Sequence, residues 1–400
     1  MGVTLLAESD SSGPPAWDPK KHPLVFITSL GPGYGGLLSD ENKLPCLVII
    51  DAETYEVVAS RTYDLGWESP FEPHGLGVSP DGQFIYLPTG DGRAKGRYLI
   101  INTRTLKIDK VLATTGRPHH ASSFIDSEGN DRVLLYGWEQ PMFVLDPKDN
   151  NRVVGGLDFN KQSMEGYLYF ATPDGDQIWA GGRWRSSSTR EDLHDNIVMV
   201  IDTKKWEVVE TIAVPESNPI WITFTLDGKT AFVSGGHTSS VMTIDRETFK
   251  TVRQTSAGVL GPYGIRLNWD ETELWAIGKG ESSHNRGKVI GLIDLTSLER
   301  RNRAYDQFVT NCIRGDHLTL HPDPSKNELW LSCNSSFEVV IFSMTTYEVI
   351  ERIPLPMGAS THSGAFVQYN ADFTGQVLSD PNGLHGPAKD AKKEIVAARE

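Results

Sequence analysis

The chain of 400 residues repeats one pattern of hydrophobic and polar positions seven times. In each copy an apolar run ends at a polar turn and a second strand-like segment follows, as in IDTKKWEVV at 201–209. The turns are 51, 44, 56, 43, 49 and 49 residues apart. A repeat of this length predicts an array of similar units. The turns begin at Asp51, Asn102, Asp146, Asp202, Asp245, Asp294 and Ser343.

Two further strand patterns precede each of these hairpins, most clearly in residues 73–102. PHGLGVS alternates small and apolar residues, QFIYLPTG is a β-rich run after an Asp-Gly turn, and RYLIIN leads into the hairpin. Each unit is therefore predicted to be a four-stranded antiparallel meander, with strands A to D. Seven such units predict an all-β fold, a seven-bladed β-propeller with its blades around a central axis.

The two ends of the chain each carry part of one unit. The N-terminal part supplies strands B, C and D at 22–29, 46–51 and 56–63, and the C-terminal part supplies a lone strand A at 363–369. Pairing these segments completes the seventh blade and leaves no open sheet edge in the ring. The predicted organisation is an N-terminal extension (1–21), one propeller domain (22–378) and a C-terminal tail (379–400).

The motifs of the repeat resemble those of a known family. SPDG or PDG turns, strands that contain IY or LW, and I-D-x-x-T hairpins recur along the chain. Over residues 22–378 this sequence resembles the YVTN-type seven-bladed β-propeller family. That family includes lactonase-like enzymes, lyases, electron-transfer subunits and binding scaffolds, so the resemblance implies the fold and leaves the function open.

Composition narrows the classes of partner and location. The net charge is −14 and no block of Lys or Arg stands out, which argues against nucleic acid and anionic membranes and leaves a small-molecule substrate as the expected partner. No stretch is long and apolar enough for a membrane span, and the N-terminus does not have the pattern of a signal peptide, so we expect a cytoplasmic protein.

Three cysteines are too few for a disulfide framework. Cys312 and Cys333 belong to one repeat and are both expected near its functional end. We expect them to be buried packing residues, with a thiol ligand or a redox pair as alternatives. Cys46 stands alone in the first repeat.

Four histidines take equivalent places in their repeats. Counting seven residues back from the A–B turn acid leads to His74 and His119, and the matching places in two more units hold His317, preceded by Asp316, and His362. These four units are consecutive in the closed ring. The imidazoles are therefore expected to form an arc at one end of the axis.

Several imidazoles without a thiolate form a metal site with open coordination positions. Iron or copper is favoured because more than three imidazoles are available, with zinc or manganese as alternatives. His120 is a weaker fifth candidate, since strand alternation points it away from His119 unless a bulge brings both to one side. The arc is similar in kind to the histidine-only sites of carotenoid-cleaving oxygenases and of the nitrous-oxide reductase propeller. A metal-free acid–base cluster is the alternative.

Other candidate residues occupy the start of strand A or the loop after strand B, which open on the same face of a propeller. Carboxylates there can orient imidazoles, and arginines can bind a substrate carboxylate. The aromatic residues have packing between blades as their alternative role. The catalytic candidates are Tyr167, Glu165, His237 and Asp316, and the substrate-binding candidates are Arg183, Arg185, Lys279, Trp221, Tyr263, Trp138 and Asn334.

Three functions follow from these features. The first is a metal-dependent oxidoreductase that performs redox or oxygen chemistry on a small aromatic or carboxylated substrate. The second is a metal-assisted lyase or lactone-handling enzyme in which histidine and Tyr167 exchange protons with the substrate. The third is a non-catalytic interaction scaffold. The sequence has no P-loop and no Gly-x-Ser-x-Gly motif, which argues against nucleotide cofactors and serine acyl transfer.

Overall fold

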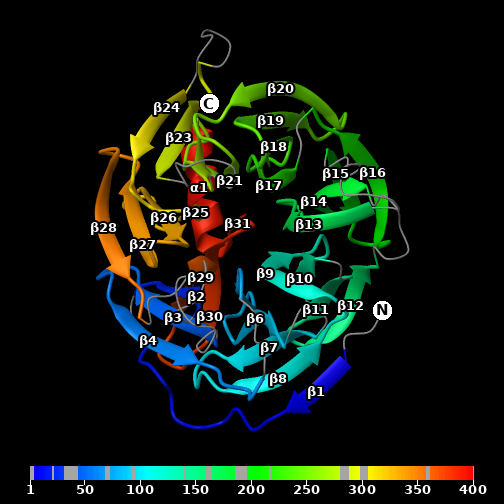
Figure 1. Cartoon of the computed structure of the whole chain (residues 1–400), viewed down its shortest axis with the longest axis vertical. Coiled ribbons are helices and arrows are strands. Elements are labelled where there is room, and N and C mark those ends of the chain that lie inside the picture. The colour runs from blue at the N-terminus through cyan, green and yellow to red at the C-terminus, as the bar shows by residue number, and fades with distance from the viewer. Residues whose placement is uncertain are drawn as a thin grey trace. The chain divides into compact units, whose positions relative to one another are not determined.

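The structure, a computed structural model, describes residues 4–19, 22–30, 44–67, 73–91, 95–138, 141–158, 164–184, 196–215, 218–279, 288–297, 305–356 and 361–399. In these ranges it contains 31 β-strands and one α-helix (Figure 1). No helix among the described residues has the length and apolarity needed to cross a membrane.

The strands form seven antiparallel sheets, as predicted, and most have four strands in chain order. The first sheet is β1 (Thr4–Glu8), β8 (Ile108–Ala113), β7 (Gly96–Asn102), β6 (Phe84–Gly90) and β5 (Gly77–Val78), and the second is β12 (Arg152–Leu157), β11 (Met142–Asp146), β10 (Asp131–Trp138) and β9 (Arg117–Ile125). The third is β13 (Met164–Ala171), β14 (Gln177–Trp184), β15 (Ile197–Asp202) and β16 (Glu207–Ala213), and the fourth is β17 (Pro219–Phe224), β18 (Thr230–Gly235), β19 (Ser240–Asp245) and β20 (Lys250–Ser256).

The remaining sheets follow the same order of strands. The fifth is β21 (Pro262–Leu267), β22 (Glu273–Gly278), β23 (Val289–Asp294) and β24 (Tyr305–Val309), and the sixth is β25 (Gly315–Leu320), β26 (Glu328–Cys333), β27 (Glu338–Ser343) and β28 (Glu348–Pro354). The seventh is β31 (Gly383–Leu384), β30 (Gly375–Asp380), β29 (Thr361–Tyr369), β2 (Leu24–Leu30), β3 (Pro45–Asp51) and β4 (Val57–Thr62).

The seventh sheet confirms the predicted pairing of the two ends of the chain. Strand β2 pairs with β29 in a register that sets Leu24 opposite Val367, and β3 and β4 continue the sheet. Figure 1 shows the blue strands β2–β4 beside the orange strand β29. The number of sheets, their strand order and this joint of the termini are those of a seven-bladed β-propeller.

The polar residue that begins each C–D turn closes the hairpin with its own side chain. Asp51 Oδ1 accepts the backbone N–H groups of Glu53 and Thr54 at 2.9 and 3.0 Å, and Tyr55 takes a positive φ of 62°. Asp202 does the same for the next two residues after Thr203, both at 2.8 Å. A turn of this kind explains why Asp or Asn interrupts the hydrophobic pattern in six repeats, and Ser343 takes the same role in the remaining one by accepting the N–H of Thr345 at 3.2 Å.

By its internal contacts the chain divides into two compact units. Unit 1 comprises Met1–Lys161, Phe337–Val339 and Arg352–Asn382, and unit 2 comprises Gln162–Ser336, Val340–Glu351 and Gly383–Glu400. In unit 1 the apolar side chains of β2, β3, β6, β7 and β29 form one buried cluster, which the ring of Trp17 joins. Trp17 also donates from Nε1 to the carbonyl of Thr103 at 2.7 Å.

The C-terminal helix α1 (Gly386–Arg399) packs against turns of unit 2. Lys389 donates to the carbonyl of Pro173 at 2.7 Å, and Lys392 forms an ion pair with Glu271 at 3.0 Å. Burial lowers the pKa of Lys392. The helix therefore has a defined place on unit 2.

Candidate functional site

A register irregularity recurs near the start of the A strands. In β9 the extra residue is His119, between Pro118 and His120, which pair with neighbouring positions of β10. In four strands two residues face one on the partner strand, and the seventh sheet has the same shift opposite β2. Such bulges re-aim side chains at a fixed place in a sheet. The residues at these places include Tyr167, Trp221, Tyr263, Asp316, His317 and His362.

Four buried imidazoles form a row in unit 1. The ring centroid of His74, just before β5, lies 4.2 Å from that of His362 on β29 and 3.9 Å from that of His119 on β9. His120 continues the row at 4.4 Å from His119. All four side chains are buried, and three of them are about 1% exposed. Three different sheets of unit 1 thus contribute to one histidine cluster.

Backbone contacts between two sheets set the register of this row. Gly75, next to His74, forms a parallel bridge with His120, and its carbonyl accepts the N–H of Ala121 at 2.9 Å. Gly77 allows the close approach, because a Cβ there would lie 2.8 Å from the carbonyl carbon of Ala121. The glycines of the His74-Gly-Leu-Gly segment therefore hold His74 beside His119.

The bulge of β9 brings His120 to the same side as His119. The hydroxyl of Tyr98 lies 3.0 Å from the carbonyl of His120 and 2.8 Å from that of Tyr136, at the point where the register shifts. Gly137 has no space for a side chain, since a Cβ would lie 2.1 Å from the carbonyl of Arg117. Because of this bulge, the strand alternation that would point His120 away from His119 is broken at this place in β9.

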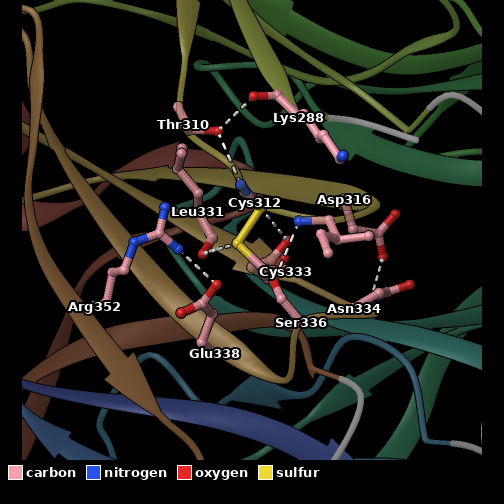
Figure 2. Close-up of a disulfide and its surroundings, with 12 residues drawn as sticks. Lys288, Thr310, Cys312, Asp316, Leu331, Cys333, Asn334, Ser336, Glu338 and Arg352 are labelled. Atoms are coloured by element: carbon pink, nitrogen blue, oxygen red, sulfur yellow. Dashed lines mark hydrogen bonds and ion pairs between the residues drawn. A yellow bond between two sulfur atoms is a disulfide. The ribbon is translucent and has the colours of Figure 1, made fainter. Parts of the chain in front are cut away.

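In unit 2 a buried carboxylate gathers three polar side chains. Asp316 Oδ1 lies 3.0 Å from Lys279 Nζ, and its Oδ2 accepts Nδ2 of Asn334 at 3.4 Å and lies 3.3 Å from Nδ1 of His317. Figure 2 shows the contact between Asp316 and Asn334. The side chain of Asp316 is completely buried and that of Lys279 is 6% exposed. The lysine cation is therefore balanced by a neighbouring anion.

The contacts of His317 define which of its nitrogens can serve as a ligand. Nδ1 lies 3.3 Å from the carboxylate of Asp316 and 3.5 Å from the hydroxyl of Ser332, and a carboxylate at this place favours the tautomer with the proton on Nδ1. This tautomer leaves Nε2 as the basic nitrogen. A carboxylate behind an imidazole is the arrangement that orients histidine ligands in metal sites. The contact between Asp316 and His317 is the one that such an orienting role requires.

Aromatic side chains surround this polar group in unit 2. The hydroxyls of Tyr167 and Tyr263 are 2.6 Å apart, and Lys279 Nζ lies 4.0 Å from the ring centroid of Tyr263. The ring of Trp221 lies 4.9 Å from that of His317 and 6.3 Å from that of Tyr263. Tyr167 is half-buried, whereas Tyr263 and Trp221 are buried. Tyr167 is therefore the member of the aromatic group that solvent can reach.

Buried side chains of metal-binding type occur in both units. Among the described residues, Asp316 and His317 in unit 2 and His362 in unit 1 are buried and can serve as metal ligands. The unit 1 row adds three further imidazoles. Among the described residues no cysteine belongs to a group of three or more candidate metal ligands, and Cys312 and Cys333 are bonded to each other.

Several predicted residues take other places. Arg185 lies outside the described residues, and for Glu165, Arg183 and Trp138 only the backbone is described. Glu165 and Arg183 are opposite each other in the pairing of β13 with β14, and Trp138 is opposite Arg117. His237 is exposed in the turn that follows β18.

The expectation that Cys312 and Cys333 are packing residues is wrong, because they form a disulfide (Figure 2). Their Cα atoms are 5.2 Å apart, within the range that a disulfide spans. Cys333 ends β26 opposite Gly315, and Cys312 precedes Gly315 by one turn. The sequence signal was present, since one cysteine comes before strand A and the other ends strand B of the same repeat.

Two contributors to the clusters were missed by the sequence analysis. Ser332 accepts the backbone N–H of His317 at 3.0 Å, and Tyr98 contacts the carbonyl of His120 from the adjacent sheet. Strand alternation relative to Asn334 could have found Ser332. Nothing in the hydrophobic pattern distinguishes Tyr98 from a core residue.

The sequence matches no family model and no curated protein. Solved structures do match the fold. Hydrazine synthase of Kuenenia stuttgartiensis is 15% identical with a TM-score of 0.53, and the match covers 79% of this chain and 98% of that one. Dihydro-heme d1 dehydrogenase NirN, solved in complex with DHE, is 16% identical with a TM-score of 0.55, and the match covers 98% of this chain and 80% of that one.

A functionally unknown protein from Desulfotomaculum acetoxidans DSM 771 is 14% identical with a TM-score of 0.55, with 84% of this chain and 98% of that one covered. At these identities the likeness shows the fold alone, because a propeller carries many unrelated functions. The resemblance to the YVTN-type family therefore stays at the level of the β-propeller fold.

Proposed function

We propose that this protein is a histidine-ligated metalloenzyme. The observation that carries the proposal is the row of four buried imidazoles in unit 1, with neighbouring centroids 3.9 to 4.4 Å apart. Protonation of several of these neighbouring rings would place like charges side by side in a medium of low dielectric constant. Neutral imidazoles that share a bound cation avoid this repulsion.

The donor set favours iron or copper as the metal. Imidazole nitrogens suit both metals, and zinc or manganese are the alternatives. His74, His119 and His362 would hold the ion, with His120 as a further ligand. His317 occupies the equivalent position in its own sequence repeat, and the carboxylate of Asp316 would orient its imidazole. A bound iron or copper ion supplies electron transfer or oxygen chemistry.

The side chains of unit 2 support an aromatic organic substrate better than a carboxylated one. The half-buried Tyr167 offers an aromatic ring and a hydroxyl that can donate or accept a hydrogen bond, and the buried rings of Trp221 and Tyr263 complete the aromatic group. Lys279 is already neutralised by Asp316. A carboxylate on the substrate would then have to be bound by Arg183 or Arg185. We keep carboxylate binding by these two arginines as part of the proposal.

Elemental analysis of protein purified without chelators tests the proposal. Wild-type protein should retain close to stoichiometric iron or copper, and the double variant His74→Ala, His119→Ala should lose it. His237→Ala is the matched control, because this histidine is exposed and lies outside the row. Metal retained in the double variant would remove the proposed site. Zinc alone in the wild type would remove the redox function.

A metal-assisted lyase is the second candidate, and the tyrosine pair favours it. The hydroxyl of Tyr167 lies 2.6 Å from that of Tyr263, so the two phenols can share a hydrogen bond, and the ammonium of Lys279 lies 4.0 Å from the centre of the Tyr263 ring. Tyr167 is thus placed to exchange a proton with a substrate. Turnover under strict anaerobiosis with manganese or magnesium, lost in Tyr167→Phe, would favour the lyase over the oxidoreductase.

A further inference from the structure

The C-terminal end of β26 has two different faces. Ser332 and Asn334 are two residues apart and lie on one face, whereas Cys333 between them points to the other. The two polar residues both contact the Asp316–His317 pair of the neighbouring strand β25. The cysteine is bonded to Cys312 (Figure 2). One short segment therefore joins the disulfide to the polar cluster.

The contacts on the polar face are specific for each partner. The hydroxyl of Ser332 accepts the backbone N–H of His317 at 3.0 Å and lies 3.5 Å from its Nδ1. Asn334 donates from Nδ2 to Asp316 Oδ2 at 3.4 Å. Both Ser332 and Asn334 are buried. If the end of the strand shifted, these hydrogen bonds would be lost and bulk water could not replace them.

The segment before β25 needs an anchor. Asn311 and Arg314 adopt positive φ values of 54° and 56°, which cost non-glycine residues free energy and persist only where the surroundings fix them. The N–H of Cys312 donates to Thr310 Oγ1 at 3.3 Å, and Asn334 N donates to the carbonyl of Arg314 at 3.2 Å. The disulfide is the covalent link between the segment before β25 and the end of β26.

From this geometry we infer that the Cys312–Cys333 disulfide is a positioning element for the Asp316–His317 pair. The disulfide fixes Cys333 on one face of the C-terminal end of β26. Ser332 and Asn334 on the opposite face are thereby held in place and fix the orientation and tautomer of His317. Its consequence for metal binding rests on the proposed function. The positioning itself concerns the protein without metal and can be measured there.

The test is a long-range ¹H–¹⁵N correlation spectrum of the histidine side chains in full-length, metal-free protein. The signals of His317 are those that disappear in His317→Gln. In wild-type protein they should show one tautomer, with the proton on Nδ1. In Cys312→Ser, Cys333→Ser they should move towards the average of the two tautomers, and Ser332→Ala, Asn334→Ala should give the same change with the disulfide intact.

Cys46→Ser is the control, because this buried cysteine lies in unit 1 and is not part of the disulfide. Unchanged His317 signals in the folded cysteine double variant would overturn the inference. If that variant does not fold, wild-type protein reduced by a phosphine under native conditions serves in its place, with the same two outcomes. Failure of the metal proposal would be seen only in the elemental analysis, so the two results are independent.

Discussion

The imidazole rings of His74 and His119 lie with their centroids 3.9 Å apart although the two residues come from different sheets. A parallel backbone bridge between Gly75 and His120 sets this distance. The pairing of the two imidazoles is therefore a property of how the sheets approach each other, and it depends on Gly75 and on Gly77, the first residue of the short strand β5.

Substitution of Gly77 by alanine should separate the two sheets. The new Cβ would lie 2.8 Å from the carbonyl carbon of Ala121 and 2.9 Å from the nitrogen of Ser122, and backbone atoms cannot move aside cheaply. We expect a loss of about 1–3 kcal/mol in the free energy of unfolding, measured with urea, and a lower metal content.

Gly66→Ala is the control for this substitution, because nothing lies within 4 Å of a Cβ at that position. Its φ of 64° alone should cost about 1–2 kcal/mol in the free energy of unfolding. Metal content is therefore the deciding measurement, and equal metal content in the two variants would show that the approach of β5 to β9 does not set the histidine row.

The disulfide makes a prediction for both stability and thiol count. Cys312→Ser, Cys333→Ser should lower the free energy of unfolding by about 3 kcal/mol, since the bond closes a loop of 21 residues in the unfolded chain. Denatured wild-type protein should react with a thiol reagent once, at Cys46, and three times after reduction.

The same thiol count bears on location. Disulfides persist in oxidising compartments and are rare in the cytoplasm. If the disulfide forms in the cell, thiols trapped at cell lysis should number one per chain, whereas a reducing compartment would leave three. One trapped thiol would place the protein in an oxidising compartment.

The seven sheets could be predicted because a single polar residue in each hairpin has one structural task. Asp51 and Asp202 accept the backbone N–H groups of their own turns, so the break in the hydrophobic pattern marks the same point in each repeat. The pairing of β2 with β29 followed from the missing strands at each end of the chain. The histidines could be indexed because the bulge recurs at the same distance from the A–B turn.

Contacts between sheets were beyond this kind of prediction. The orientation of His120 depends on a bulge in β9 that Tyr98 contacts from strand β7 of another sheet. The hydrophobic periodicity of the sequence does not reveal this bulge. Lys279 follows β22 and meets Asp316 on the next sheet, so the loop position that suggested a substrate contact produced an ion pair. A contact of this kind depends on side-chain packing, which the spacing of residues does not encode.

The ion pair between Lys279 and Asp316 should be strongly coupled. Lys279→Met leaves a buried carboxylate without its cation, and we expect a loss of about 3–5 kcal/mol in the free energy of unfolding. Adding Asp316→Asn should recover part of this loss, because the uncompensated charge is then removed. Urea unfolding of the single and double variants gives the coupling free energy.

Lys205→Met is the matched control for this cycle. Its ammonium lies 3.7 Å from Glu207, but both side chains are more than half exposed, so the change should be below about 1 kcal/mol. Additive effects of Lys279→Met and Asp316→Asn would contradict a buried ion pair.

His321 should make the protein less stable in acid. Burial lowers the pKa of its imidazole below the ordinary value of 6.5, and Nδ1 accepts the N–H of Asp323 at 3.1 Å. The folded protein then binds fewer protons at this site than the unfolded chain, so the free energy of unfolding falls as the pH drops through 6.5 towards the lowered pKa. Asparagine can accept the same hydrogen bond and does not titrate. The stability of wild-type protein relative to His321→Asn should therefore decrease between pH 7.5 and pH 5, measured by urea unfolding. A pH-independent difference between the two proteins would refute the assignment.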